Sequence, residues 1–423
     1  MKIYLVTGLI LYFLPVFGQD NSSLSYIDKI YDQKIKTVQL YPLVADPAAQ
    51  TYPPVISLHG QTQLVLEFDE LFEDARYYRV RLIHCNANWQ PSGLADSQFL
   101  EEYNEFEIMD YEYSFNTLTP YVHYTFTVPR PTLPGNYLLM VYDAEDEKRV
   151  ILTRRFLVFE QQVSFTDKQQ IIAQAPYSLT HQPLQFTVYY NKLDLLNPRE
   201  YVKVHILQNH RWDNALLNLA PSFVYEDRKA LDYKYYDDDK SFPGGNEFRY
   251  FDMRSLKYPG FHIRAVSFQK NKVYAWLEND KPRQQLAYTI ELNNMRGNFF
   301  IDNIEQKIPD IENDYALVSF TLKGGPYKED VYISGRLTDW QKSEATRMHW
   351  NAATQAYEGT LVLKQGQYAY QYLLDGDRER QNDIEGNKRE TRNRYEILVY
   401  YYSQTLRTDL LIGYYSFIYD LQH

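Results

Sequence analysis

The residues of this chain that could carry chemistry are a run of three acids and an adjacent histidine–cysteine pair. Asp237–Asp239 offers the carboxylate oxygens that Ca²⁺ prefers. A calcium loop alternates its ligands around a turn glycine, however, whereas these acids are consecutive and Lys240 follows them. His84 and Cys85 are common metal ligands, but neighbours on a strand point to opposite faces. We therefore predict no metal site and interpret the acid run as a solvated loop.

The sequence also lacks the motifs with which common enzymes build an active site. It contains no GxSxG, no HExxH, no P-loop and no GxGxxG. A carboxylate pair for glycoside hydrolysis cannot be found by spacing among 55 acids, because its two groups come from different elements. The nine histidines are scattered and are interpreted as strand residues. No catalytic and no cofactor-binding residue is predicted, and the protein is predicted not to be an enzyme.

The elements that must position any site are predicted to be β-strands. Tyrosine occurs 41 times, and its ring suits a strand that is buried on one face while its hydroxyl reaches water. The fold class is therefore predicted to be all-β, with tandem immunoglobulin-like β-sandwich modules and one short helix near 94–105. The expected strands include 64–68, 77–83, 121–128, 137–142, 150–159, 185–190, 201–208, 261–269, 273–277 and 286–292.

A chain of 423 residues is too long for a single core, and its length favours about three domains. Turn clusters such as Pro129–Gly135 separate the apolar runs. The predicted divisions are a signal peptide (1–18), an N-terminal sandwich (19–160), a second β domain (161–310), a third sandwich (311–402) and a C-terminal tail (403–423).

The start of the chain and its charge indicate where it works. Lys2 precedes an uncharged apolar run, Ile3–Leu14, and small residues follow, which is typical of a secretory signal peptide cleaved near Gly18–Gln19. No cysteine stands directly after that position, so a lipid anchor is not expected. The net charge of −11 argues against a nucleic-acid partner, and the single Cys85 cannot form an internal disulfide.

The third module contains three segments in a recognisable order, namely Val331–Trp340 (VYISGRLTDW), Tyr357–Leu361 (YEGTL) and Gly366–Gly376 (GQYAYQYLLDG). It resembles the glycogen-binding, early-set immunoglobulin-like modules of amylases and of the AMP-activated kinase. In that family two aromatic platforms and a lysine hold the sugar.

Trp340 matches the first of those platforms, but Arg378 stands at the second and Gln371 at the lysine. Losing one stacking face and the cation removes most of what would hold a sugar ring. Trp340, together with Trp89 of the first module, is therefore kept as a candidate for an interaction surface or for a relic sugar platform.

Motifs along nearly the whole chain carry a second resemblance. They are Arg79–Ser92 (RVRLIHCNANWQPS), Tyr111–Thr117 (YEYSFNT), Tyr121–Tyr124 (YVHY), Pro134–Leu139 (PGNYLL), Phe242–Glu247 (FPGGNE), Glu385–Asn387 (EGN), Asn393–Tyr395 (NRY) and Val399–Tyr401 (VYY). In this order they resemble the plug protein family of the type IX secretion system.

That resemblance implies a non-enzymatic protein without cofactors, located in the periplasm at the inner face of the outer membrane. Its partner would be the outer-membrane β-barrel translocon, which it would close when no substrate is present, as a monomer attached to the membrane only through that partner. The alternative is a periplasmic carbohydrate-binding or glycan-processing accessory protein. A transmembrane β-barrel would also explain the tyrosines, but the mean hydropathy of −0.52 disfavours it.

Overall fold

The computed structural model describes residues 24–168, 173, 175–235, 240–291, 294–378 and 380–421. The predicted signal peptide (1–18) and the acid run Asp237–Asp239 lie outside these residues. The described chain is built almost wholly of β-strands, so the all-β prediction is confirmed. No helix within the described ranges is both long enough and apolar enough to cross a membrane.

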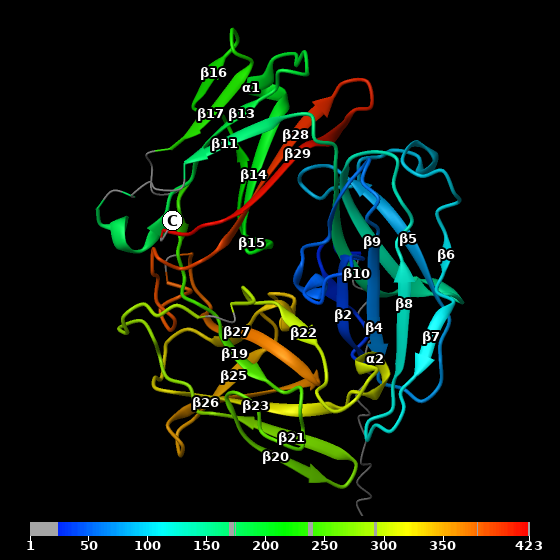
Figure 1. Cartoon of the computed structure of the whole chain (residues 1–423), viewed down its shortest axis with the longest axis vertical. Coiled ribbons are helices and arrows are strands. Elements are labelled where there is room, and N and C mark those ends of the chain that lie inside the picture. Colours follow the sequence, from blue (N-terminus) through cyan, green and yellow to red (C-terminus); the bar gives the residue numbers. More distant parts are fainter. Residues whose placement is uncertain are drawn as a thin grey trace, which may run out of the picture.

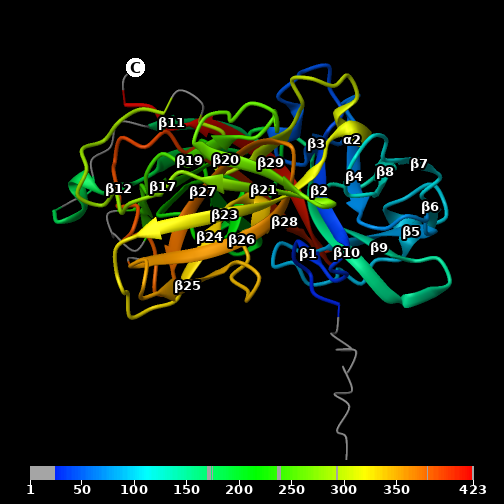
Figure 2. The same ribbon diagram turned by 90° about the horizontal axis from the view of Figure 1, so that it is seen from below.

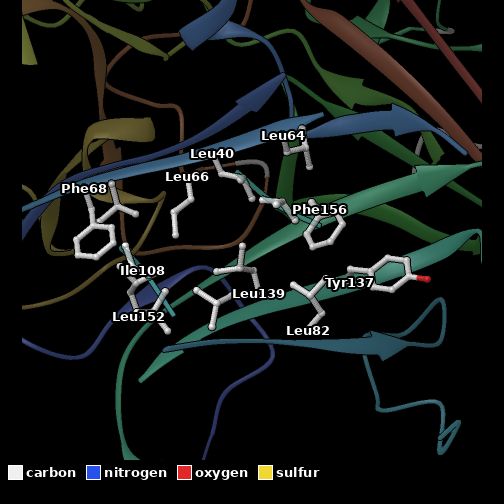
Figure 3. Packing of buried hydrophobic residues seen from close by; sticks show 14 of the residues in the cluster. Leu40, Leu64, Leu66, Phe68, Leu82, Ile108, Tyr137, Leu139, Leu152 and Phe156 are labelled. Carbon is white, nitrogen blue, oxygen red and sulfur yellow. The ribbon is translucent and has the colours of Figure 1, made fainter. Parts of the chain in front are cut away.

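The first sandwich (β1–β10) packs two sheets face to face, at the right of Figure 1. One sheet has the order β1-β10-β9-β5-β6 with β3 parallel to β10, and the other has the order β2-β4-β8-β7. Figure 3 shows Leu66 of β4 facing Leu139 of β9 across the core. The elements are β1 (Lys29–Ile30), β2 (Ile35–Pro42), η1 (Ala49–Thr51), β3 (Val55–Ser57), β4 (Leu64–Glu70), β5 (Tyr78–Cys85), η2 (Asp96–Gln98), β6 (Phe106–Glu107), β7 (Asp110–Tyr113), β8 (Val122–Thr127), β9 (Gly135–Asp143) and β10 (Asp146–Phe159).

The second sandwich combines the middle of the chain with its last strands. The sheet β11-β13-β17-β16 covers the sheet β15-β14-β28-β29, and Figure 1 shows the red C-terminal strands beside the green β14. The elements are β11 (Ser164–Lys168), η3 (Tyr177–Leu179), β12 (His181–Gln182), β13 (Gln185–Tyr189), α1 (Pro198–Tyr201), β14 (Val202–Gln208), β15 (Arg211–Leu219), β16 (Phe223–Tyr225), β17 (Ala230–Lys234), β18 (Phe242–Pro243), β28 (Arg394–Ser403) and β29 (Thr408–Ile418).

The third unit (β19–β27) is one strongly curved sheet, nearly closed like a barrel. Its strands follow the order β19-β27-β24-β25-β26-β23-β21-β20, with β22 also on β27. The elements are β19 (Arg249–Asp252), β20 (Ile263–Gln269), β21 (Lys272–Leu277), β22 (Phe299–Ile301), α2 (Pro309–Glu312), β23 (Tyr315–Lys323), β24 (Val331–Ser334), η5 (Arg336–Thr338), β25 (Arg347–Asn351), β26 (Ala356–Lys364) and β27 (Gly366–Leu374).

Strand pairing crosses two of the boundaries expected from the sequence. Residues 249–277, expected in the second module, pair with strands of the third unit through β27 and β23. Residues 408–418, expected as a tail, form β29 on β28, which itself pairs with β14. Local patterns cannot reveal such pairing because the partner strands are far apart in the chain. The division into independent folding units stays a prediction.

Two local expectations were wrong. Residues 286–291, expected as part of a strand, form no strand, and Tyr288 there donates a hydrogen bond of 2.7 Å to the buried Glu247. The helix expected near 94–105 is only the three-residue turn η2. In both segments the contacts that fix the backbone come from other parts of the chain, whereas the predictions used local residue types alone.

Candidate functional site

The histidine–cysteine pair of β5 offers no reactive group. His84 packs edge-on against Tyr137 at 5.0 Å, while Cys85 is buried in a separate apolar cluster with Leu138. Burial lowers the pKa of His84 to about 4, and burial raises the pKa of Cys85 to about 12 against the opposing charge of Arg155. At neutral pH the imidazole is uncharged and the thiol is protonated. In the described part of the chain no three His, Cys, Asp or Glu side chains are grouped to hold a metal.

Trp89 lies in the joint between the first and second sandwiches and not on an open surface. It is 5% exposed and meets Trp212 of β15 edge-on at 5.0 Å. The guanidinium of Arg155 lies 4.2 Å from the Trp89 ring and 5.4 Å from the Trp212 ring. Arg155 in turn donates a hydrogen bond of 2.8 Å to the carbonyl of Tyr26. Trp89 therefore acts as a packing residue that joins two units.

The loop that carries Trp89 also forms hydrogen bonds with strands β14 and β29 of the second sandwich. The Ala87 amide donates to Asp409 Oδ2 at 3.1 Å, and the Ala87 carbonyl lies 3.1 Å from His205 Nε2. Asn86 Oδ1 accepts from the Thr408 hydroxyl at 2.8 Å and from the Asp409 amide at 3.1 Å. The segment CNANW belongs to one of the motifs that resemble the secretion family. It is thus a part of the first sandwich that contacts the second sandwich.

Two arginines, the buried Arg154 and the half-buried Arg336, hold the first sandwich to the third unit. Arg154 of β10, with only 1% of its side chain exposed, pairs with Asp339 at 2.9 Å. In the opposite direction Arg336 of the third unit pairs with Asp28 at 2.8 Å. Burial alone would raise the pKa of Asp28, but the charges of Arg336 and Arg154 outweigh it and lower the pKa to about 2. These reciprocal pairs are short, buried and directional, which is the geometry in which ion pairs fix an arrangement.

The joint between the second sandwich and the third unit uses three more of the quoted motifs. Asn246 donates to the Glu385 carbonyl at 2.9 Å, and Asn393 donates to the Gly244 carbonyl at 2.7 Å. Within the third unit, Glu385 also accepts from Arg249 Nε of β19 at 2.9 Å. A side chain on Gly244 would collide with the carbonyl of Lys388, so only glycine allows the two segments to approach this closely.

The second sandwich covers the face of the third unit on which the sugar-platform residues stand. Arg211 lies 4.6 Å from the Trp340 ring, and Phe248 meets that ring edge-on at 5.8 Å. Gln371 is 4% exposed, and Arg378 lies 4.9 Å from the ring of Phe242. A sugar platform must present an open aromatic face. Each of the three positions therefore packs against protein.

An exposed apolar patch spans the first sandwich and the third unit. The patch comprises Tyr113 at the end of β7, Phe115 and Leu118 just after it, and Ile304 and Ile308, which precede α2. Their exposed fractions are 54%, 59%, 39%, 65% and 48%. The Phe115 amide donates to the Ile311 carbonyl at 2.8 Å, and the Leu118 amide donates to Asp314 at 2.9 Å. Figure 1 shows α2 beside β7 and β8. Exposed apolar groups held in fixed positions are typical of a protein-binding surface.

The joints and the patch were missed by reasoning from sequence. One signal was available, because strands β4 and β26 are apolar but contain Asp69 and Lys364, and a charge inside a buried strand demands a partner. The partner itself could not be named from the sequence. The arrangement as a whole offers contact surface and fixed shape.

Comparisons with known proteins agree with this architecture. The family described as "Type 9 secretion system plug protein 1st domain" matches residues 35–160, which cover β2 to β10. A crystal structure of a hypothetical protein from Parabacteroides merdae is 30% identical, with a TM-score of 0.86 over 94% of this chain and 100% of that chain. Trypsin-activated alpha-2-macroglobulin from Escherichia coli is 7% identical, with a TM-score of 0.18 over 90% of this chain and 23% of that chain. No curated protein matches the sequence.

Proposed function

Because this chain belongs to the type IX secretion system plug protein family, we propose that it closes the outer-membrane barrel translocon of that system. It binds the barrel from the periplasmic side, as a single chain and without catalysis, whenever no substrate occupies the channel. The role is steric. It requires a body of fixed shape and a surface that binds reversibly, because substrate must be able to displace it.

The observation that carries this proposal is that buried contacts join each of the three units to the other two. A body that blocks an opening by its bulk must not hinge, and domains in one chain move relative to one another unless their interface is large and specific. Here Arg154–Asp339 and Arg336–Asp28 fix the first sandwich to the third unit, and Glu385 is among the residues that fix the third unit to the second sandwich. The chain is thereby held as one block.

The exposed apolar patch supplies the contact surface in this proposal. Its aromatic and aliphatic groups lie on loops tied to each other by backbone hydrogen bonds, so little ordering entropy is lost when a partner covers them. Aromatic side chains at the centre of an interface contribute most of its binding energy. The patch therefore meets the periplasmic rim of the barrel.

Deleting the gene tests the steric role. The deletion strain should admit large antibiotics that the outer membrane normally excludes, and deleting the barrel as well should restore the barrier. An accessory protein for glycans would instead give a growth defect on particular glycans whether or not the barrel is present. Unchanged permeability in the single deletion, with no difference in the double deletion, would refute the plug role.

Copurification of the barrel tests the patch. The double variant Phe115→Ser with Ile308→Ser should retain less barrel than the native chain at equal expression. The matched control is Phe223→Ser with Phe268→Ser, which removes two rings of similar exposure (58% and 55%) from other strands and should retain the barrel fully. Equal retention by both double variants would show that the barrel binds elsewhere.

The carbohydrate-binding alternative is supported by no contact in the described chain. Arg211 lies over the ring of its one aromatic candidate in the third unit, Trp340, and Phe248 meets that ring edge-on.

A further inference from the structure

A cavity of about 480 Å³ lies where all three units meet. It is lined by residues 39–40, 47–48 and 50–54 of the first sandwich, by 209–210 and 394 of the second sandwich, and by 294–296, 298–300, 336, 340 and 367 of the third unit. Its volume is that of a pocket for a small organic molecule. Much of its wall is apolar, including Tyr52, Pro53, Met295, Phe300 and Trp340.

Two arginines in this wall have no partner. The guanidinium groups of Arg296 and Arg394 make no hydrogen bond and no ion pair with any other described residue, and Arg296 Nε is buried without an acceptor. Burial and the charges of Arg394 and Arg392 together lower the pKa of Arg296 to about 10, against the opposing charge of Glu247. The wall therefore holds like charges that repel one another, which is unfavourable unless an anion enters.

The neighbouring acids are already engaged elsewhere. Glu396 accepts from His210 at 2.8 Å on one oxygen and from Tyr414 at 2.7 Å on the other. Glu247 accepts from Tyr288 at 2.7 Å and from the Arg392 amide at 3.1 Å. By contrast Arg336, at the edge of the same cavity, is neutralised by Asp28. Arg296 and Arg394 therefore make no direct ion pair and keep only a longer-range attraction to these engaged acids, Arg296 to Glu247 and Arg394 to Glu396.

The backbone conformation at Arg296 also favours a binding role for this residue. Its φ is 51°, in the left-handed region where arginine has no conformational advantage over asparagine or glycine. The adjoining Gly297 has a φ of 81° and lies against the Trp340 ring, so the turn places Arg296 beside the aromatic wall. A guanidinium in such a position is suited to binding more than to stability.

We propose that this cavity binds an organic carboxylate, with the carboxylate group held by Arg296 and Arg394 and an apolar body packed against Tyr52, Met295 and Phe300. The planar guanidinium fork matches a planar carboxylate. A phosphate ion could also pair with the two guanidinium groups, but it has no apolar body to cover the apolar walls. The carboxylate belongs either to a free small acid or to the carboxyl terminus of a peptide, since both present the same group.

Isothermal titration of the mature chain tests the site with paired probes. The free-acid pair is 3-phenylpropionate and 3-phenylpropanamide. The peptide pair is an acetylated dipeptide ending in phenylalanine, with a free or an amidated carboxyl terminus. At least one carboxylate should bind, and its amide should bind at least about tenfold more weakly. The pair that responds identifies the source. Binding of neither carboxylate, equal binding of acid and amide, or tighter binding of inorganic phosphate would overturn the proposal.

Variants assign the binding to the two arginines. Arg296→Gln and Arg394→Gln should each weaken the carboxylate by at least about tenfold, whereas Arg264→Gln, at an exposed arginine of β20, should leave it unchanged. Without ligand, Arg296→Gln should keep or raise Tm, because it removes repulsion between cations. Full carboxylate affinity in both cavity variants would overturn the assignment. These binding measurements do not depend on the proposed plug role.

Discussion

Replacing Lys364 by methionine should destabilise the chain, because it breaks a buried charge cluster between the first sandwich and the third unit. Lys364, at the end of β26, donates to Asp69 of β4 at 2.6 Å, and each side chain is only 1% exposed. Asp69 also accepts from His123 at 2.7 Å and from Tyr315 at 2.5 Å. The Lys364 ammonium lies 4.4 Å from the ring of Tyr121, which completes the cluster.

The magnitude follows from the charge that the variant leaves behind. Burial alone would raise the pKa of Asp69, but Lys364 and His123 outweigh it and hold the pKa below its usual range. Methionine keeps most of the apolar stem and removes only the cation. Removing one partner of a buried pair costs about 3–5 kcal/mol, because the other charge remains buried without full compensation. That is a large fraction of the stability of an ordinary domain.

Urea unfolding followed by tryptophan fluorescence gives the measurement. The double variant Asp69→Asn with Lys364→Met should recover much of the loss, because it buries no uncompensated charge. The control Lys272→Met, at an exposed lysine of β21, should stay within about 0.5 kcal/mol of the native chain. A loss of under about 1 kcal/mol in Lys364→Met, or a double variant less stable than the single one, would refute the reasoning.

The pH dependence gives a second test of the same cluster. Burial lowers the pKa of His123, but its hydrogen bond to Asp69 and the charge of Asp69 raise it more, while Lys364 opposes the rise. A raised pKa means that the stability from protonated His123 is full below its unfolded pKa of about 6.5 and is lost as pH rises through the folded pKa. Without Lys364 the pKa of His123 in the folded chain rises further. The loss of unfolding free energy in Lys364→Met should therefore be smaller at pH 6 than at pH 9. The opposite order would contradict this assignment.

The other expected outcomes concern single sites. Cys85 should resist iodoacetamide at pH 8 in the folded chain and react after denaturation, as intact mass would show, because burial raises its pKa to about 12. Asp339→Asn should lower Tm more than Asp339→Asn combined with Arg154→Met, because the single variant leaves a buried guanidinium unpaired. Maltoheptaose titrated into the full chain should give no heat and no change in tryptophan fluorescence, because Arg211 covers Trp340, and a clear sub-millimolar signal would contradict this.

Several strands follow directly from local patterns. In β5 the buried Tyr78, Val80 and Leu82 alternate with the less buried Arg79 and Arg81, and period-2 alternation is what a half-buried strand requires. The same reasoning located β4, β9 and β14. It failed over 286–291, where apolar residues occur but contacts with distant segments set the backbone. Propensity is a weak guide where long-range contacts dominate.

The sequence by itself determined the all-β class, the position of most strands and, through motifs spread along the chain, the family. Only the tertiary structure decided what those motifs do and which charges meet. Asp69 and Lys364 are 295 residues apart, and the Asn86 loop meets Thr408 across 322 residues. Alternation reports which face of a strand is buried but carries no information about the element that covers it. Joints, counter-charges and the cavity with its unpaired arginines therefore depend on how the units pack, which no local pattern records.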